Sequence, residues 1–257
     1  MQTENVQPAI TLINVAIFHV LKKNGIIPAA TAGHSLGEYA SLYAAGVIKF
    51  TDLMKLVQAR GLFMKEAAAD NPGGMVMPMG MNVEAIEKIC LELPEGDHLE
   101  IANINSPKQV IVSGTKESLE EFSAMAKKAG TKFIVPLKVS GPWHSRLMTP
   151  AKKKLETVIS ETTFQKPEIP FIANATGDYV NDEDRIKKNL IAQLTSTVQW
   201  NQSMRKFIQD GHNLFIEAGP KMVLKALMRE TNRDVVVYNV DNMKTLTKLL
   251  SSMESAS

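Results

Sequence analysis

The feature that most constrains this chain is the pentapeptide GHSLG at 33–37, which matches Gly-x-Ser-x-Gly. It lies between a predicted strand at 27–32 and a predicted helix that begins just after Ser35. In such a turn the glycines let the backbone bend sharply, so that the serine hydroxyl projects at the carboxyl end of a sheet. The pentapeptide alone also fits an ordinary strand-to-helix turn. Its position favours a nucleophile elbow in an α/β fold, with Ser35 as the candidate nucleophile.

Predicted strands and helices alternate along most of the chain. Before the elbow, apolar residues recur at helical spacing over 7–23, and Gly25 is placed to end that helix. After it, a helix fits 52–69 with Thr51 as N-cap. Further helices are predicted at 147–160, 182–194, 200–209, 221–230 and the end of the chain, and strands at 169–174, 213–217 and 234–238. This alternation predicts a hydrolase-like α/β core with a mainly parallel sheet.

The segment between these parts has a different order of elements. Predicted strands cover 75–80, 100–103, 109–113 and 132–137, and predicted helices cover 83–93 and 116–129, the second capped by Thr115. The order βαββαβ is ferredoxin-like, with a turn at 105–107 in the central hairpin. We therefore expect an inserted ferredoxin-like subdomain at 73–138 and an α/β catalytic domain formed by 1–72 and 139–257.

Composition excludes several other classes of protein. The formal net charge is +2, which gives no indication of binding to nucleic acid. No basic leader with an apolar stretch precedes the first helix, and no apolar run reaches the ~18 residues that span a bilayer. The single cysteine, Cys90, excludes an internal disulfide and a zinc finger, so it is interpreted as a packing residue. We expect a cytoplasmic monomer without membrane contact.

A serine nucleophile needs a neighbouring base, and the chain has five histidines. His19 falls within the first helix, whereas His98 and His212 fall in loops, so that packing or surface roles suit these three. His34 adjoins the nucleophile at a tight turn where consecutive side chains point apart. His144 lies in the restricted loop at 141–145 after a predicted strand, a common position for catalytic groups. From its position alone a structural role for His144 stays equally open.

Six motifs in order along the chain carry a family resemblance. They are GHSLGEYASLYAAGVI, QARG around Arg60, NSPKQVIVSG, VSGPWHSRLM, LTSTVQW and FIEAGPKMVL. Together they resemble the malonyl-CoA:acyl carrier protein transacylases and the related acyltransferase domains of polyketide synthases. The resemblance covers residues 7 to 240.

The resemblance assigns roles to individual residues. Ser35 would be the nucleophile and His144 the general base. The main-chain carbonyl of Gln193 would hold the imidazole through Nδ1, with Nε2 facing the serine, and the Gln193 side chain would be incidental. The N-H of Leu36, at the start of the helix, is the natural donor to an oxyanion. The family also has an N-terminal strand and a Gly-Gln-Gly loop that supplies a second donor, and no such tripeptide occurs in this sequence.

Arg60 is the candidate for substrate selection. It lies close to the apolar stripe of the predicted helix at 52–69, and an inward guanidinium needs an anion. Reaching to the surface or pairing with a buried carboxylate are the alternatives. The resemblance implies that Arg60 binds the free carboxylate of a malonyl group. Trp143 resembles a position that carries a bulky aromatic residue in malonyl-selective domains, although it would serve equally as a loop anchor, and His34 is a further candidate for substrate binding.

The implied reaction is a ping-pong transfer of malonyl from malonyl-CoA to the thiol of acyl carrier protein, without a metal or redox cofactor. Carrier proteins are acidic, so Lys132, Lys152, Lys153 and Lys154 are candidates for docking, although a solvated face explains each of them as well. Two other functions stay open. A serine esterase or thioesterase would need a carboxylate before a C-terminal histidine, and the last histidine is His212. An inactive protein that only binds the carrier would explain the missing Gly-Gln-Gly.

Overall fold

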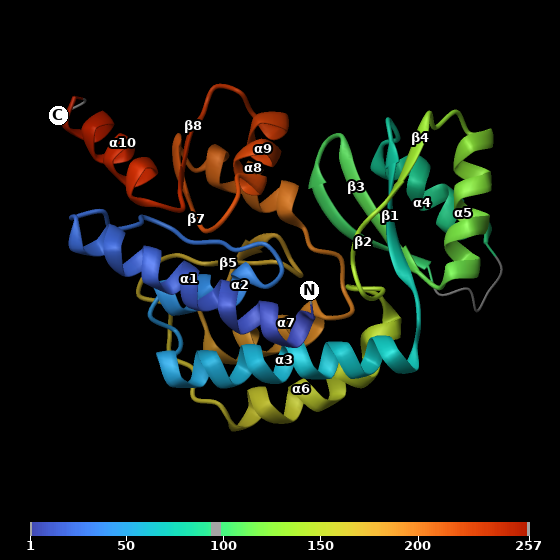
Figure 1. The fold of residues 1–257 in the computed structure, drawn as a ribbon, viewed down its shortest axis with the longest axis horizontal. Coiled ribbons are helices and arrows are strands. Elements are labelled where there is room, and N and C mark those ends of the chain that lie inside the picture. The colour runs from blue at the N-terminus through green and yellow to red at the C-terminus, as the bar shows by residue number, and fades with distance from the viewer. Residues whose placement is uncertain (1, 94–98, 256–257) are drawn as a thin grey trace.

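The computed structural model describes residues 2–93 and 99–255. Figure 1 shows a helical layer at the base, a four-stranded sheet with two helices on one side, and the C-terminal strands and helices on the other. Two segments link the four-stranded sheet to the helical layer: the connection that precedes β1 (Gly74–Met79) and the loop that follows β4 (Phe133–Pro136).

The helical layer is built on α1 (Thr3–Lys23) and α3 (Phe50–Asp70), which lie side by side. α3 also packs against α6 (Thr149–Glu161), and α2 (Gly37–Ala44) and α7 (Glu183–Gln193) complete the layer. Their apolar faces meet in a core of fully buried side chains that includes Leu42, Leu53, Leu56, Leu155 and Ile159. This core fixes α3 and the start of α2 relative to each other.

α1 ends where the sequence predicted. Gly25 has a φ of 78°, the left-handed conformation that favours glycine, and its N-H donates to the Lys22 carbonyl while that of Ile26 donates to the Leu21 carbonyl. These two bonds satisfy carbonyls that the helix end leaves free. Neither α1 nor any other helix within 2–93 and 99–255 is long and apolar enough to cross a membrane.

The C-terminal part contains a parallel pair of strands, β7 (Leu214–Ala218) and β8 (Val236–Val240). They are accompanied by α8 (Trp200–Gln209), α9 (Val223–Thr231) and α10 (Met243–Glu254). Two short strands, β5 (Ile172–Ala173) and β6 (Asp178–Tyr179), form an antiparallel pair, and a parallel bridge joins Thr31 to Phe171. The α/β class predicted from the alternation is confirmed, with the parallel pairing at β7–β8 and at Thr31.

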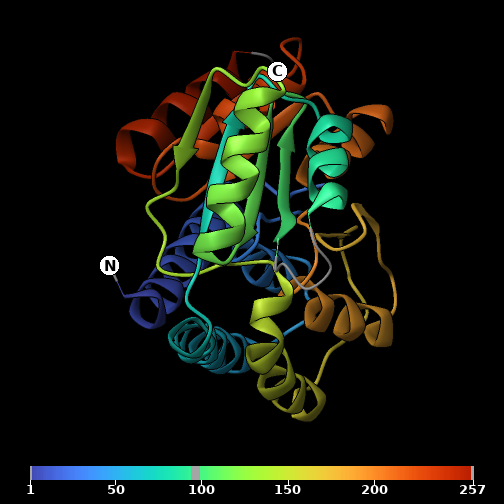
Figure 2. The same ribbon diagram turned by 90° about the vertical axis from the view of Figure 1, so that its right-hand side faces the viewer.

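The segment predicted as ferredoxin-like forms the four-stranded sheet. Its strands are β1 (Gly74–Met79), β2 (Leu99–Ser106), β3 (Gln109–Gly114) and β4 (Phe133–Pro136), in the antiparallel order β2-β3-β1-β4. Helices α4 (Val83–Glu92) and α5 (Lys116–Lys128) cover one face, as Figure 2 shows. Their shared core includes Val76, Ile86, Val110, Val112 and Phe122. The βαββαβ order agrees with the sequence, and the boundaries 73 and 138 stay a prediction.

Several local predictions differ from the structure. The strand expected at 27–32 is reduced to the single bridge at Thr31, because only that residue has a strand partner. Thr51 lies inside α3, whose N-cap is Lys49, so the predicted cap is wrong. Thr115 does cap α5, since its hydroxyl accepts from the Ser118 N-H. The central hairpin turns at 107–108 and not at 105–107, because β2 extends to Ser106.

Candidate active site

Ser35 lies in a tight turn between Thr31 and α2. Its φ is 50°, in the left-handed region that is unfavourable for a residue with a Cβ. The N-H groups of Gly37 and Glu38 donate back to the carbonyls of His34 and Ser35, at 2.9 and 3.2 Å, which closes the turn into the helix. A Cβ on Gly33 would lie 2.0 Å from the Gly37 carbonyl carbon, so the elbow requires glycine there through close backbone approach.

Ser35, His144 and Gln193 form a hydrogen-bonded chain. His144 lies in the loop between β4 and the short 3-10 helix η1 (Arg146–Met148), and it also has a left-handed φ, 58°. Its Nε2 is 2.8 Å from Ser35 Oγ, and its Nδ1 is 2.8 Å from the main-chain oxygen of Gln193. A carbonyl oxygen can only accept, so the proton is on Nδ1 and Nε2 faces the serine hydroxyl as an acceptor. This is the arrangement predicted for a serine and its base.

The surroundings keep His144 neutral. It is 3% exposed. The pKa of His144 is lowered from 6.5 to about 3, chiefly by burial and next by the Arg60 cation, while the bond to the Gln193 carbonyl partly opposes both effects. At neutral pH the imidazole therefore has a free lone pair at Nε2 to receive the hydroxyl proton.

Arg60 reaches the same point from α3. The side chain is 1% exposed, and Nη2 donates to Ser35 Oγ at 3.1 Å. Nη1 donates to Gln7 Oε1 at 2.7 Å and Nη2 also to Gln193 Oε1 at 3.1 Å. Within the described part of the chain Arg60 forms no salt bridge, and its buried Nε has no hydrogen-bond partner. The alternatives of a surface position and of an ion pair with a buried carboxylate are therefore not what is seen. A buried guanidinium that has no salt bridge and lies beside a serine hydroxyl is suited to an anionic ligand.

The Gln193 side chain does more than the sequence predicted. Gln193 is fully buried at the end of α7, and Nε2 donates to the main-chain oxygen of Ser35 at 2.9 Å and to Oε2 of Glu38, while Oε1 accepts from Arg60. The expectation that this side chain is incidental does not agree with these contacts. It connects the nucleophile, the guanidinium and a buried carboxyl group.

Glu38 and Asn174 are parts of the site that the sequence prediction missed. Glu38, 1% exposed in the first turn of α2, accepts from the Asn174 main-chain N-H at 3.1 Å. Burial raises the pKa of Glu38 to about 7, against the hydrogen bonds it accepts and the charge of Arg60. The Asn174 side chain contacts both sides of the elbow, with Oδ1 2.7 Å from the Ser35 nitrogen and Nδ2 2.7 Å from the Gly33 oxygen. The acidic residue directly after the elbow pentapeptide was the available indication for Glu38.

The family can be decided with this geometry in hand. A model described as the acyl transferase domain matches residues 1–254. The chain belongs to the acyl transferase family. It is 38% identical over 253 residues to the malonyl CoA-acyl carrier protein transacylase of Bacillus subtilis (strain 168), an alignment that covers 98% of this chain and 80% of the relative. The acyltransferase class predicted from the sequence is confirmed.

Solved structures of acyl transferases agree with this assignment. The crystal structure of an acyl carrier protein S-malonyltransferase from Vibrio cholerae O1 biovar eltor matches with a TM-score of 0.93 at 37% identity, over 96% of this chain and 81% of that one. A malonyl-transacylase in complex with its type II PKS acyl-carrier protein matches with a TM-score of 0.94 at 34% identity, over 98% of this chain and 82% of that one. The similarity extends over both the helical layer and the four-stranded sheet.

The other predicted site residues of this acyl transferase are near the same turn. The N-H of Leu36 has no acceptor among the described residues, which leaves it available to an oxyanion. His34 bonds through Nε2 to Asn105 Oδ1 at 2.7 Å and meets the Trp200 ring edge-on, and burial lowers the pKa of His34. Trp143 packs between the helical-layer core and a small cluster on the four-stranded sheet, in the manner of a loop anchor.

The remaining histidines lie elsewhere in this acyl transferase. His19 is on the surface and bonds to the Tyr43 hydroxyl at 2.7 Å. His212 stacks edge-on against Phe207, at the beginning of the C-terminal strands. His98 lies outside the described residues. Neither His19 nor His212 has a hydrogen bond to Ser35, in agreement with the surface and packing roles predicted for them.

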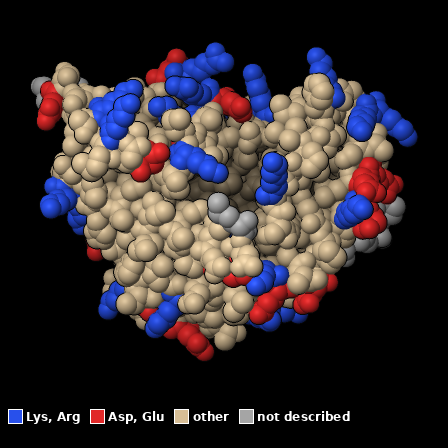
Figure 3. All heavy atoms as spheres, in the orientation of Figure 1, with Lys and Arg blue, Asp and Glu red and all other residues tan. Residues whose placement is uncertain are grey.

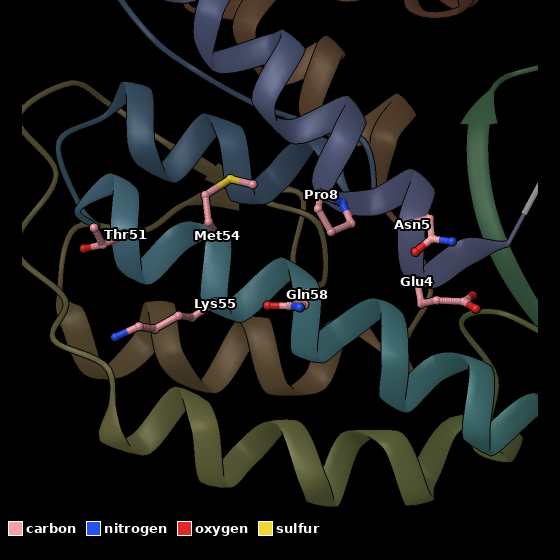
Figure 4. Close-up of a pocket in the computed structure, with 7 residues that line it drawn as sticks. All are labelled: Glu4, Asn5, Pro8, Thr51, Met54, Lys55 and Gln58. Carbon is pink, nitrogen blue, oxygen red and sulfur yellow. The ribbon is translucent and has the colours of Figure 1, made fainter.

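The surface of this acyl transferase has a hollow and a separate pocket. Figure 3 shows a hollow between the four-stranded sheet and the C-terminal part, with Lys and Arg side chains beside it. A pocket of about 450 Å³ between α1 and α3 (Figure 4) is lined by residues such as Glu4, Pro8, Met54 and Gln58. None of the predicted site residues lines that pocket. Of the candidate docking lysines, Lys154 pairs with Glu66 at 2.6 Å, and the other three are not placed in a contact with the site.

Proposed function

We propose that this acyl transferase moves a malonyl group from malonyl-CoA to the phosphopantetheine thiol of an acyl carrier protein, through an ester on Ser35. The observation that carries the proposal is the meeting of three groups at one point. Ser35 Oγ is 2.8 Å from the base His144 and 3.1 Å from the guanidinium of Arg60. The names of the similar proteins, which are malonyl transacylases, support the choice of acyl group.

In the first half-reaction Ser35 Oγ attacks the thioester carbon of malonyl-CoA, and His144 Nε2 takes the hydroxyl proton. The negative charge that develops on the carbonyl oxygen is received by the N-H of Leu36 at the start of α2. When the carbon–sulfur bond breaks, the proton on His144 passes to the CoA sulfur. The product is malonyl-Ser35 and free CoA, with His144 neutral again.

In the second half-reaction the carrier thiol attacks the ester, and His144 takes its proton and returns it to the serine oxygen. Ser35 regains its hydroxyl, and the malonyl thioester leaves on the carrier. The solved complex of a similar malonyl-transacylase with its carrier protein supports the nature of the acceptor. The nucleophile, the base and the anion-binding group are all side chains of this chain, so the proposed steps require no metal and no redox cofactor.

Arg60 supplies the selection for a dicarboxylic acyl group. The free carboxylate of malonate can take the place of Ser35 Oγ at Nη2 and use the unpaired Nε. The guanidinium is buried without an ion pair, so a neutral acetyl group would leave its charge uncompensated. Trp143 and His34 are proposed as further substrate-binding residues, Trp143 by limiting the space for a methyl group on the acyl chain.

The partner and setting follow from the same chemistry. Lys132, Lys152, Lys153 and Lys154 are proposed contacts for the acidic carrier protein. A single cysteine and a thiol acceptor that has to stay reduced suit the cytoplasm, and we propose a monomer that works there.

The test is a transfer assay with malonyl-CoA and the phosphopantetheinylated carrier protein, with Ser35→Ala as the inactive control. We expect malonyl-carrier and free CoA to appear in equal amounts, and neither to appear with the variant. Release of free malonate without transfer would instead indicate the thioesterase alternative. Binding of the carrier without any turnover would indicate a binding protein.

A further inference from the structure

The Asn174 side chain is a part of the site that the proposed reaction leaves without a task. Asn174 directly follows β5 and is 1% exposed. Its Oδ1 accepts from the Ser35 N-H at 2.7 Å, and its Nδ2 donates to the Gly33 oxygen at 2.7 Å. One side chain thus bonds to the backbone on both sides of His34, just where the chain turns.

The orientation of this amide is determined by its partners. The Ser35 N-H can only donate and the Gly33 oxygen can only accept, so exchanging the nitrogen and oxygen of Asn174 would place like groups against each other. Only a side chain with one acceptor and one donor in this geometry makes both bonds. A carboxylate of the same shape would keep the bond to Ser35 and face the Gly33 oxygen with a second oxygen.

The residue that Asn174 bonds to is held in an unfavourable conformation. A left-handed φ is unfavourable for a residue with a side chain, and Ser35 has a φ of 50°. This conformation directs Oγ toward His144 Nε2, 2.8 Å away. Without an acceptor for its N-H, the Ser35 backbone would lose a hydrogen bond that stabilises this conformation.

Asn174 is itself firmly placed. Its main-chain N-H donates to Glu38 Oε1 at 3.1 Å, and its main-chain oxygen accepts from the Gln199 N-H at 2.9 Å. The strand residues just before it pair with Thr31, whose N-H donates to the Pro170 oxygen at 2.8 Å. The segment that carries Asn174 is therefore joined both to the entry of the elbow and to the helix that leaves it.

We propose that Asn174 is a positioning residue, which holds Ser35 in the left-handed conformation that aligns its hydroxyl with His144. The inference rests on the proposed role of Ser35 as the acylated serine. In the part of the chain that the structure describes, Asn174 forms no hydrogen bond with His144 or Arg60, so its effect acts through the backbone of the elbow. A residue of this kind influences the rate of acylation at saturation and leaves the binding of the malonyl carboxylate to Arg60 largely unchanged.

The test compares Asn174→Ala with Asn239→Ala. Asn239 is also buried, and it lies on strand β8, away from the elbow. Its Nδ2 donates to the main-chain oxygens of Gly219 and Lys221 at 3.1 and 2.7 Å. Each variant is mixed rapidly with saturating malonyl-CoA, and malonyl-Ser35 is followed by intact mass. Thermal unfolding gives the folded fraction, and the labelling of Ser35 by a sulfonyl fluoride, which carries no carboxylate, is measured in parallel.

We expect Asn174→Ala to slow acylation and sulfonyl fluoride labelling roughly 10- to 100-fold per folded molecule, with KM for malonyl-CoA within about twofold. Asn239→Ala should lower thermal stability without slowing either reaction. If Asn174→Ala does not fold, Asn174→Asp replaces it with the same expected result, because its second oxygen faces the Gly33 oxygen. Acylation by the Asn174 variant as fast as by the Asn239 variant would overturn the inference. Failure of the wild-type protein to form malonyl-Ser35 would instead refute the proposed function, and sulfonyl fluoride labelling would still test Asn174.

Discussion

Replacing Arg60 by Ala should lower the rate of acylation by malonyl-CoA far more than the rate by acetyl-CoA. The guanidinium is 1% exposed, has no salt bridge among the described residues, and points a donor at Ser35 Oγ from 3.1 Å. A malonyl carboxylate meets that cation, and an acetyl group offers nothing in its place. The variant therefore removes an interaction that only one of the two substrates can form.

The size of the effect follows from the contacts. Two charge-assisted bonds between a guanidinium and a carboxylate contribute about 1.5–3 kcal/mol each. Their loss corresponds to a decrease of roughly 10²- to 10⁴-fold in kcat/KM for malonyl-CoA. For acetyl-CoA, removing Arg60 also has effects that favour acylation. The Arg60 cation lowers the pKa of His144, and Arg60 Nη2 occupies a lone pair of Ser35 Oγ, so the variant makes His144 more basic and Ser35 Oγ more available. We expect kcat/KM for acetyl-CoA to stay within about tenfold.

The assay measures kcat/KM for both substrates with the same enzyme preparation, so that loss of folded protein cancels in their ratio. Arg60→Lys is the matched variant, because it keeps the charge and loses the planar pair of donors. Its selectivity should lie between those of the wild type and Arg60→Ala. An unchanged malonyl-to-acetyl ratio in Arg60→Ala would refute the assignment of Arg60 to the acyl carboxylate.

Three further predictions test other parts of the site. The pKa of Glu38 is raised from 4.5 to about 7, so between these pH values the folded state binds more protons than the unfolded state and loses stability as pH rises. Glu38→Gln should remove up to about 3 kcal/mol of this pH dependence of the unfolding free energy, measured by denaturant titrations at several pH values. The same pH dependence in the variant and the wild type would contradict this prediction. Gly33→Ala, whose Cβ would lie 2.0 Å from the Gly37 backbone, should destabilise the protein by roughly 1–3 kcal/mol and abolish acylation, whereas Gly37→Ala, with nothing within 4 Å, should leave thermal stability intact. Trp143→Ala should raise kcat/KM for methylmalonyl-CoA relative to that for malonyl-CoA. A variant that is less stable but has an unchanged ratio of the two values would show that Trp143 serves only in packing.

The parts of the site that the sequence predicted are those with a local pattern. The turn at Ser35 is encoded by residues next to it, the loop at His144 has its own motif, and Arg60 follows the helical period of α3. The structure then brings these segments together, although Ser35 and His144 are 109 positions apart in the sequence. Fold class was predictable for the same reason, since alternation of strands and helices is read over short windows.

The supporting contacts were not predictable, because they join polar residues that are far apart in the chain. Asn174 is 139 residues from Ser35, and Glu38 is 155 residues from Gln193. In sequence Glu38 is a charge in the first turn of a helix, which normally faces water. Its burial depends on the amide groups of two distant segments. The strand before Ser35 was overestimated because apolar composition alone does not show whether a partner strand lies alongside.

The central claim is that Ser35, His144 and Arg60 act together to form a malonyl ester on Ser35. The most direct measurement is the intact mass of the protein after mixing with malonyl-CoA, followed by mapping of the modified peptide. We predict one added malonyl group per chain, located on Ser35, lost when carrier protein is added and never formed by Ser35→Ala. A protein that gains no malonyl group, or gains it on another residue, would contradict the account.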